Sequence, residues 1–72
     1  MFDRVKSIIS KFTEEEITPE SSLMGDLGLT SFDLVSIVAE FEDEFDIEVP
    51  DRDILGFVTI QDVIDYLEEN AE

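Results

Sequence analysis

The sequence predicts a small all-α fold, and three observations support this prediction. Apolar residues recur at helical spacing in three separate segments, two of these segments begin with a pair of residues that can cap a helix, and no segment yields a strand prediction. The 72 residues suffice for one small domain, which we assign to residues 1–72. Regularly spaced hydrophobic residues, 43% of the chain, argue against disorder despite a net charge of −16.

The first predicted helix covers roughly residues 2–15. Its apolar residues share one face, and they are Phe2, Val5, Ile8, Ile9 and Phe12. A polar run around Pro19 ends the pattern, and residues 17–29 show no period. Because glycines at 25 and 28 permit tight turns, we expect an ordered long loop here. Its expected anchors across the helices are Leu23, Met24, Leu27 and Leu29.

The second predicted helix covers about residues 31–46. Thr30 is the expected N-cap, and Asp33 can complete a capping box near the positive end of the helix dipole. Val49 and Pro50 are expected to stop the helix. One face is expected to enter the core through Leu34, Ile37, Val38, Phe41 and Phe45.

The same helix carries a second, smaller apolar strip on its opposite side. This strip consists of Phe32, Val35 and Ala39, and it is flanked by the acids Glu42, Asp43 and Asp46. An ordinary amphipathic helix does not need a second strip, and an exposed apolar patch rimmed by charge is typical of a docking surface.

The last part of the chain predicts a short helix and a longer one. Residues 51–55 can form one helical turn that Gly56 ends. Thr59 and Asp62 form a second potential capping box, which starts a helix over about residues 60–69. Its inward residues are expected to be Ile60, Val63, Ile64 and Leu67. The predicted organisation is therefore three main helices, a short third helix, and a long loop after the first.

Composition excludes several classes of function. Nucleic acid is not an expected partner of a chain with a net charge of −16, because binding relies on Lys and Arg to neutralise phosphates. We instead expect partners with basic patches. The chain has no cysteine, which excludes disulfides and cysteine metal sites. Neither a signal peptide nor a membrane-spanning run is found, so we expect a cytoplasmic protein.

The acidic run from residue 40 to residue 53 does not match a calcium loop. An EF-hand needs a glycine at the sixth loop position, and no glycine lies between Gly28 and Gly56. We predict no specific metal site, although loose divalent binding could relieve carboxylate repulsion.

Ser31 is the strongest candidate for chemistry. A serine at a helix start is most often a cap or a solvated hydroxyl. Here Thr30 can supply the cap, which leaves the Ser31 hydroxyl free to point outward. A nucleophilic serine needs an adjacent base, but the chain has no histidine and its lysines lie in the first helix. We therefore predict no catalytic residue, and interpret Ser31 as a residue that another protein modifies.

Three segments in order, residues 27–33, 42–51 and 59–67, resemble the acyl carrier protein family, and the resemblance extends over essentially the whole chain. The resemblance implies a four-helix bundle whose Ser31 receives 4′-phosphopantetheine from coenzyme A. A separate phosphopantetheinyl transferase, of the holo-ACP synthase type, would attach it. The cofactor's thiol would then carry acyl groups as thioesters between fatty-acid or related biosynthetic enzymes, which fits the absence of cysteine.

The resemblance also implies roles for further residues of a monomeric carrier that has no activity of its own. Acyl-transferring and condensing enzymes with basic patches would dock on Phe32, Asp33, Val35, Ala39, Glu42 and Asp43. The interior that shelters the acyl chain would include Leu34, Val38, Phe41, Phe45 and Ile64.

Two residues depart from the family pattern. Thr30 replaces the usual aspartate before the serine, and Ser36 stands where fatty-acid-type members usually carry a glutamate. Both changes remove acidity from the docking end of the second helix. They leave open a dedicated carrier for an aminoacyl or D-alanyl group, a polyketide or a peptide. An unmodified acidic interaction module is the alternative from another class, and it predicts that Ser31→Ala leaves function intact.

Overall fold

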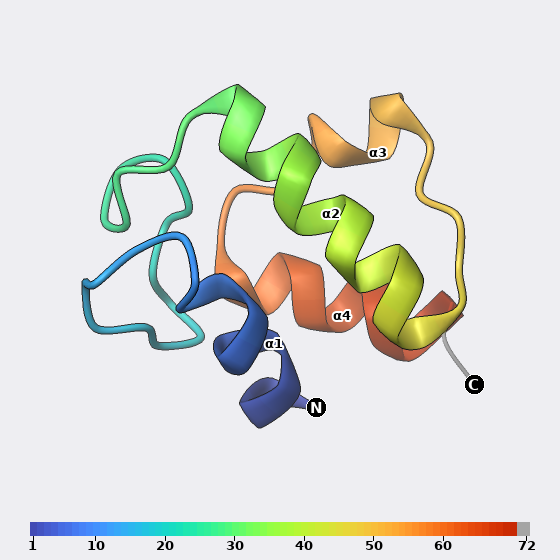
Figure 1. The fold of residues 1–72 in the computed structure, drawn as a ribbon, viewed down its shortest axis with the longest axis horizontal. Coiled ribbons are helices and arrows are strands. Elements are labelled where there is room, and N and C mark those ends of the chain that lie inside the picture. The colour runs from blue at the N-terminus through green and yellow to red at the C-terminus, as the bar shows by residue number, and fades with distance from the viewer. Residues whose placement is uncertain (71–72) are drawn as a thin grey trace.

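The computed structural model describes residues 1–70 of the chain. Its helices are α1 (Phe2–Ile9), α2 (Ser31–Phe45), α3 (Asp51–Ile54) and α4 (Ile60–Asn70). Helix α1 packs against both α2 and α4, and the short α3 lies against α2 (Figure 1). Three main helices, a short third helix and a long loop after α1 confirm the predicted all-α organisation.

The core lies between α1, α2 and α4 and also takes in side chains of the long loop. All five residues predicted for the inner face of α2 are buried, namely Leu34, Ile37, Val38, Phe41 and Phe45. The predicted inner face of α4 is buried as well, with Ile60, Val63, Ile64 and Leu67. Burial of each such side chain contributes about 1.5–3 kcal/mol to the free energy of unfolding.

Helix α1 is shorter than the predicted range of residues 2–15, because it ends at Ile9. Beyond it, the amides of Lys11 and Phe12 donate to the carbonyl oxygens of Ile8 and Ile9, at 3.2 and 2.9 Å, in a tighter turn. A longer helix would place three consecutive glutamates, residues 14–16, at its negative C-terminal end, which is unfavourable. The apolar period therefore continues to Phe12, whereas the helix does not.

Both predicted capping boxes are present. The amide of Asp33 donates to the Thr30 hydroxyl oxygen at 3.1 Å, and the amide of Thr30 donates to the Asp33 carboxylate at 3.0 Å. At the start of α4, the Asp62 amide donates to the Thr59 hydroxyl at 3.2 Å, and the Thr59 amide donates back to the Asp62 carboxylate at 3.1 Å. Each box satisfies backbone donors that a helix start otherwise leaves unpaired.

Helix α2 ends at Phe45, one residue before the predicted end. Asp46 adopts the left-handed conformation, with φ 56° and ψ 52°, and its amide still donates to the Glu42 carbonyl. This left-handed residue, rather than Val49 and Pro50, stops the helix, and Pro50 serves as the N-cap position of α3.

The long loop is held by buried apolar side chains and by a paired backbone. Its buried anchors are Ile17, Leu23, Leu27 and Leu29, and Gly28 makes a left-handed turn with φ 68°. Met24 departs from the prediction, because half of it is exposed. It follows Leu23 directly in a stretch that turns back on itself, so the two side chains cannot both enter the core.

The loop is also joined to the segment that leads into α4. The Leu23 amide donates to the Val58 carbonyl at 2.8 Å, and the Ile60 amide donates to the Ser21 carbonyl at 3.0 Å. A third bond of 2.8 Å runs from the Gln61 amide to the Pro19 carbonyl. These bonds bring two segments that are distant in sequence together on one side of the bundle (Figure 1).

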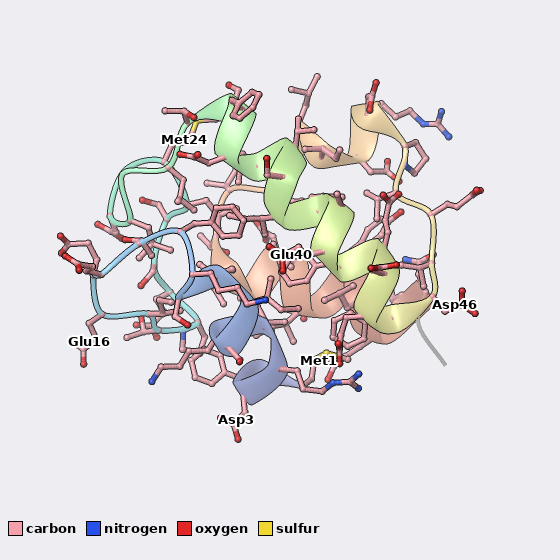
Figure 2. All side chains as sticks on the ribbon, viewed as in Figure 1. Met1, Asp3, Glu16, Met24, Glu40 and Asp46 are labelled. Carbon is pink, nitrogen blue, oxygen red and sulfur yellow. The ribbon has the colours of Figure 1, made fainter. Side chains whose placement is uncertain are left out.

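One basic residue of α1 and one that follows this helix pair with acids of α2. Arg4 contacts Glu44 at 2.7 Å and stacks 4.4 Å from the centre of the Phe45 ring. Lys11, just after α1, contacts Glu40 at 2.8 Å, and Figure 2 shows Glu40 midway along α2. Among residues 1–70, no helix is long and apolar enough to cross a membrane.

Candidate functional site

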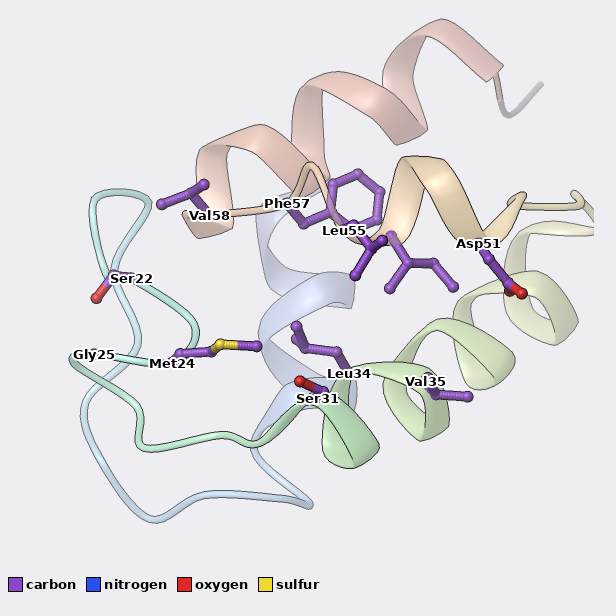
Figure 3. A pocket seen from close by; sticks show the side chains of 11 residues that line it. Ser22, Met24, Gly25, Ser31, Leu34, Val35, Asp51, Leu55, Phe57 and Val58 are labelled. Atoms are coloured by element: carbon purple, nitrogen blue, oxygen red, sulfur yellow. The ribbon is translucent and has the colours of Figure 1, made fainter.

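Ser31 is the first residue of α2, and its side chain is exposed. The neighbouring Thr30 supplies the cap hydrogen bond, so the helix start does not use the Ser31 hydroxyl. Figure 3 shows Ser31 at the edge of a pocket, on the same side as Met24 and Leu34. The sequence-predicted serine therefore lies at an accessible and rigid position.

The pocket beside Ser31 has a volume of about 370 Å³ and lies between the N-terminal half of α2, the long loop, and α3 with its following segment. Most of its wall is apolar and consists of Met24, Leu34, Val35, Ile54, Leu55, Phe57 and Val58. The remaining lining residues are Ser22, Gly25, Ser31 and Asp51. Such a pocket suits an apolar group of modest size attached near Ser31.

The residues predicted for the acyl interior are all buried, but they do not all line this pocket. Leu34 forms part of its wall (Figure 3). Val38, Phe41, Phe45 and Ile64 belong to the core cluster deeper in the bundle. Their role in sheltering an acyl chain stays a prediction.

Sequence reasoning missed most of the opposite wall of the pocket. Leu55 and Val58 are 81% and 60% exposed, respectively, and they face the pocket together with Phe57. The available signal was the apolar run of residues 54–58, which only Gly56 interrupts and which lies mostly between the two helices. Met24 joins this wall only because the loop pairs with Val58.

The six residues predicted for docking have different environments. Phe32 and Val35 are 78% and 56% exposed, and Ala39 and Asp43 are also exposed. In contrast, the Asp33 carboxylate caps α2. The Glu42 carboxylate accepts a hydrogen bond of 2.8 Å from the Val49 amide and so holds the chain that leads to α3. Docking by these residues remains a prediction, and two of the three acids also have a structural role.

Helix α3 is joined to α4 behind the pocket. The Tyr66 hydroxyl donates to the Asp53 carboxylate at 2.9 Å, and the Tyr66 ring meets the Phe57 ring edge-on with centres 5.3 Å apart. Burial raises the pKa of Tyr66, and the hydrogen bond to Asp53 raises it further. The phenol is therefore a stable donor at neutral pH.

The arrangement around Ser31 offers an exposed serine beside an apolar pocket. The chain has no histidine, which is the most frequent general base beside a reactive serine. Within residues 1–70, no group of three or more acidic side chains is placed to hold a metal ion. The site can accept a group that another protein transfers, and its pocket can receive an apolar part of that group.

The chain is similar to known proteins in sequence and in structure. A family model described as "Phosphopantetheine attachment site" matches residues 3–67. Acyl carrier proteins from two strains of Clostridium perfringens, SM101 and 13, are each 43% identical to this chain, over 100% of its length and 99% of theirs. A solved structure from Mycobacterium tuberculosis, assigned as an acyl carrier protein, superposes with a TM-score of 0.87 at 31% identity and covers 94% of this chain and 95% of that one.

Proposed function

This chain belongs to the acyl carrier protein family, and we propose that Ser31 is the residue that carries its 4′-phosphopantetheine. The prosthetic group supplies a thiol that holds acyl groups as thioesters. The observation that carries the assignment to Ser31 is the position of its exposed hydroxyl at the mouth of the apolar pocket, next to a threonine that already caps α2.

The chemistry of attachment divides between two proteins. The Ser31 oxygen forms a new bond to the phosphorus that bears the pantetheine arm of coenzyme A, and Ser31 loses its proton. The pyrophosphate bond of coenzyme A breaks, and adenosine 3′,5′-bisphosphate leaves. On this proposal a phosphopantetheinyl transferase contributes the base, since this chain has no histidine to take the proton. On this proposal the chain is a carrier and not an enzyme.

The lining of the pocket favours an apolar acyl group as cargo. An aminoacyl group would bring a charged ammonium against walls made mainly of aliphatic and aromatic side chains, at a desolvation cost. Among residues 1–70, Asp51 is the only charged residue that lines the pocket. We therefore rank fatty-acid-type or polyketide-type cargo above aminoacyl cargo.

The exposed residues beside Ser31 indicate how biosynthetic enzymes dock. Phe32 and Val35 are exposed apolar side chains within one turn of Ser31, and Asp43 is an exposed acid farther along α2. A partner that combines an apolar socket with basic residues would complement this surface. The transferase meets the same end of α2, because it must reach Ser31.

Intact-mass measurement tests the proposal. The protein is incubated with coenzyme A, Mg²⁺ and a broad-specificity phosphopantetheinyl transferase. The wild type is expected to gain one phosphopantetheinyl group, and Ser31→Ala none. Ser36→Ala, a second serine on α2, is the matched control and is expected to gain the group like the wild type.

Two other results would contradict the assignment. A gain by Ser31→Ala would place the group on another residue. No gain by the wild type with several transferases would favour an unmodified interaction module that docks basic proteins through α2.

A further inference from the structure

We propose that Tyr66 is a positioning residue that holds the α3 wall of the pocket in place through its hydrogen bond to Asp53. The inference rests on the proposed function, because it concerns the retention of an acyl chain in the pocket beside Ser31. Tyr66 itself does not line that pocket, so its influence acts through Asp53 and Phe57.

Helix α3 has little stability of its own. It has only four residues, and no side chain caps its start. Isolated helices of this length do not persist in water, because nucleation costs more than so few hydrogen bonds return. Ile54 is its only buried residue. Contacts with the rest of the molecule therefore determine where α3 lies.

Tyr66 supplies such contacts from α4. Its hydroxyl donates to Asp53 at 2.9 Å, and its ring packs edge-on against Phe57 with an interplanar angle of 77°. Among residues 1–70, the bond from Tyr66 to Asp53 is the only side-chain hydrogen bond that joins α3 to another helix. Tyr66 thus holds the chain at α3 and again just after it.

Both points of attachment adjoin the pocket wall. Asp53 lies between Asp51 and Ile54, which line the pocket, and Phe57 lines the pocket directly. Phe57 also borders a shallower groove behind α3 that is lined by Asp53 and Tyr66. Movement of α3 away from α2 would therefore have to break the bond to Asp53 or shift the Phe57 ring.

The chemistry of the bond suits a permanent attachment. Asp53 is a carboxylate acceptor, and hydrogen bonds to charged groups are stronger than those between neutral groups. The pKa of Tyr66 is raised by burial and by this bond, so the phenol keeps its proton across the physiological range.

The first test uses the unmodified protein and measures amide hydrogen exchange. The substitution Tyr66→Phe keeps the ring against Phe57 and removes only the hydroxyl. The amides of Asp53, Ile54 and Leu55, which donate to Pro50 and Asp51, are expected to exchange about three- to tenfold faster, because the bond from Tyr66 is only partly buried and its loss is moderated by solvent. The Leu34 amide in α2 is the internal reference and is expected to keep its rate.

The second test measures acyl retention. Each variant is converted to its octanoyl or acetyl form, and hydroxylamine is added, which cleaves the thioester to a hydroxamate and a free thiol. The octanoyl form of Tyr66→Phe is expected to react about three- to tenfold faster than that of the wild type. The acetyl forms are expected to react equally, since an acetyl group buries too little apolar surface to stay in the pocket.

Two control variants separate positioning from general destabilisation. Asp53→Asn keeps an oxygen that can accept from Tyr66 but removes the charge, and its rates are expected to lie between those of the wild type and Tyr66→Phe. Ile9→Val trims the core at α1, far from α3 in the sequence, and is expected to lower the melting temperature without changing the ratio of octanoyl to acetyl rates.

Equal octanoyl rates for Tyr66→Phe and the wild type would overturn the proposal, as would unchanged exchange at the α3 amides. If the wild type gains no phosphopantetheine, the proposed function fails, and the exchange measurement still decides whether Tyr66 positions α3.

Discussion

At the first turn of α2, two neighbouring side chains have separate tasks. Thr30 accepts the hydrogen bond that caps the helix, and Ser31 presents an unused hydroxyl. An aspartate at position 30 would cap equally well and add a negative charge beside Ser31. The threonine therefore keeps the helix start intact while it makes the surroundings of Ser31 less acidic.

The substitution Thr30→Ala is expected to lower the free energy of unfolding by about 1 kcal/mol, because it removes the cap of α2. Urea denaturation followed by circular dichroism measures the change. Thr30→Ser, which keeps the hydroxyl, is the matched control and is expected to remain near the wild type. An unchanged midpoint for Thr30→Ala would show that the capping box contributes nothing.

Tyr66 provides a prediction about pH. Its folded-state pKa lies above the ordinary value of 10.0, because burial, Asp53 and more weakly Glu42 oppose the phenolate, although Arg52 favours it. The stability contributed by the protonated phenol is therefore fully present below pH 10 and is lost as the pH rises through the folded pKa.

Phenolate absorbance measures this difference directly, because the chain has one tyrosine and no tryptophan. The titration midpoint is expected to be higher in the folded protein than in denaturant. Asp53→Ala is expected to reduce the difference between the titration midpoints of Tyr66 in the folded protein and in denaturant. Equal midpoints in the folded and unfolded states would contradict both the burial and the bond.

At the scale of elements, the end of α2 depends on one left-handed residue. Asp46 adopts φ 56° without being glycine, and Figure 2 shows it where α2 ends. Aspartate tolerates this conformation better than most residues, but glycine adopts it without steric cost.

The substitution Asp46→Gly is expected to raise the free energy of unfolding by roughly 0.5 kcal/mol, since relief of the left-handed strain exceeds the added freedom of the unfolded chain. Thermal melts of the wild type, Asp46→Gly and Asp46→Asn measure the effect. The asparagine variant removes the charge but keeps the conformation at a similar cost. If Asp46→Asn is as stable as Asp46→Gly, the loss of the charge rather than the relief of backbone strain explains the higher stability.

The elements also show what the sequence could and could not predict. Thr30 with Asp33 reveals a helix start, because a capping box involves residues three apart. The predicted end of α1 is wrong, because the apolar spacing continues to Phe12 although the chain beyond Ile9 forms a tighter turn. The pocket wall could not be predicted, because Met24 and Val58 meet only through pairing between distant segments.

At the scale of the whole molecule, charge is divided unevenly. Three of the four basic residues lie in the first twelve positions, and two of them pair with α2. Those two pairs occupy Glu44 and Glu40, and they leave the other acids of α2 without a basic partner among residues 1–70. Because exposed ion pairs contribute little, repulsion among the acids dominates the electrostatics.

The melting temperature is therefore expected to rise with added NaCl, since a net charge of −16 repels itself and salt screens that repulsion beyond about 10 Å at 0.1 M. Calorimetry between low and moderate salt measures the change. A variant with Glu68→Gln and Glu69→Gln, both exposed on α4, is expected to show a smaller rise. A melting temperature independent of salt would contradict this explanation.

The bonds that join residues 19–23 to residues 58–61 also bear on the rate at which the chain folds. They close loops of about half the chain, and closing such a loop costs chain entropy before its contacts can form. Helix α1 and helix α4 meet across a still longer stretch of sequence. We therefore expect this protein to fold more slowly than a helical bundle of the same size whose contacts are all local.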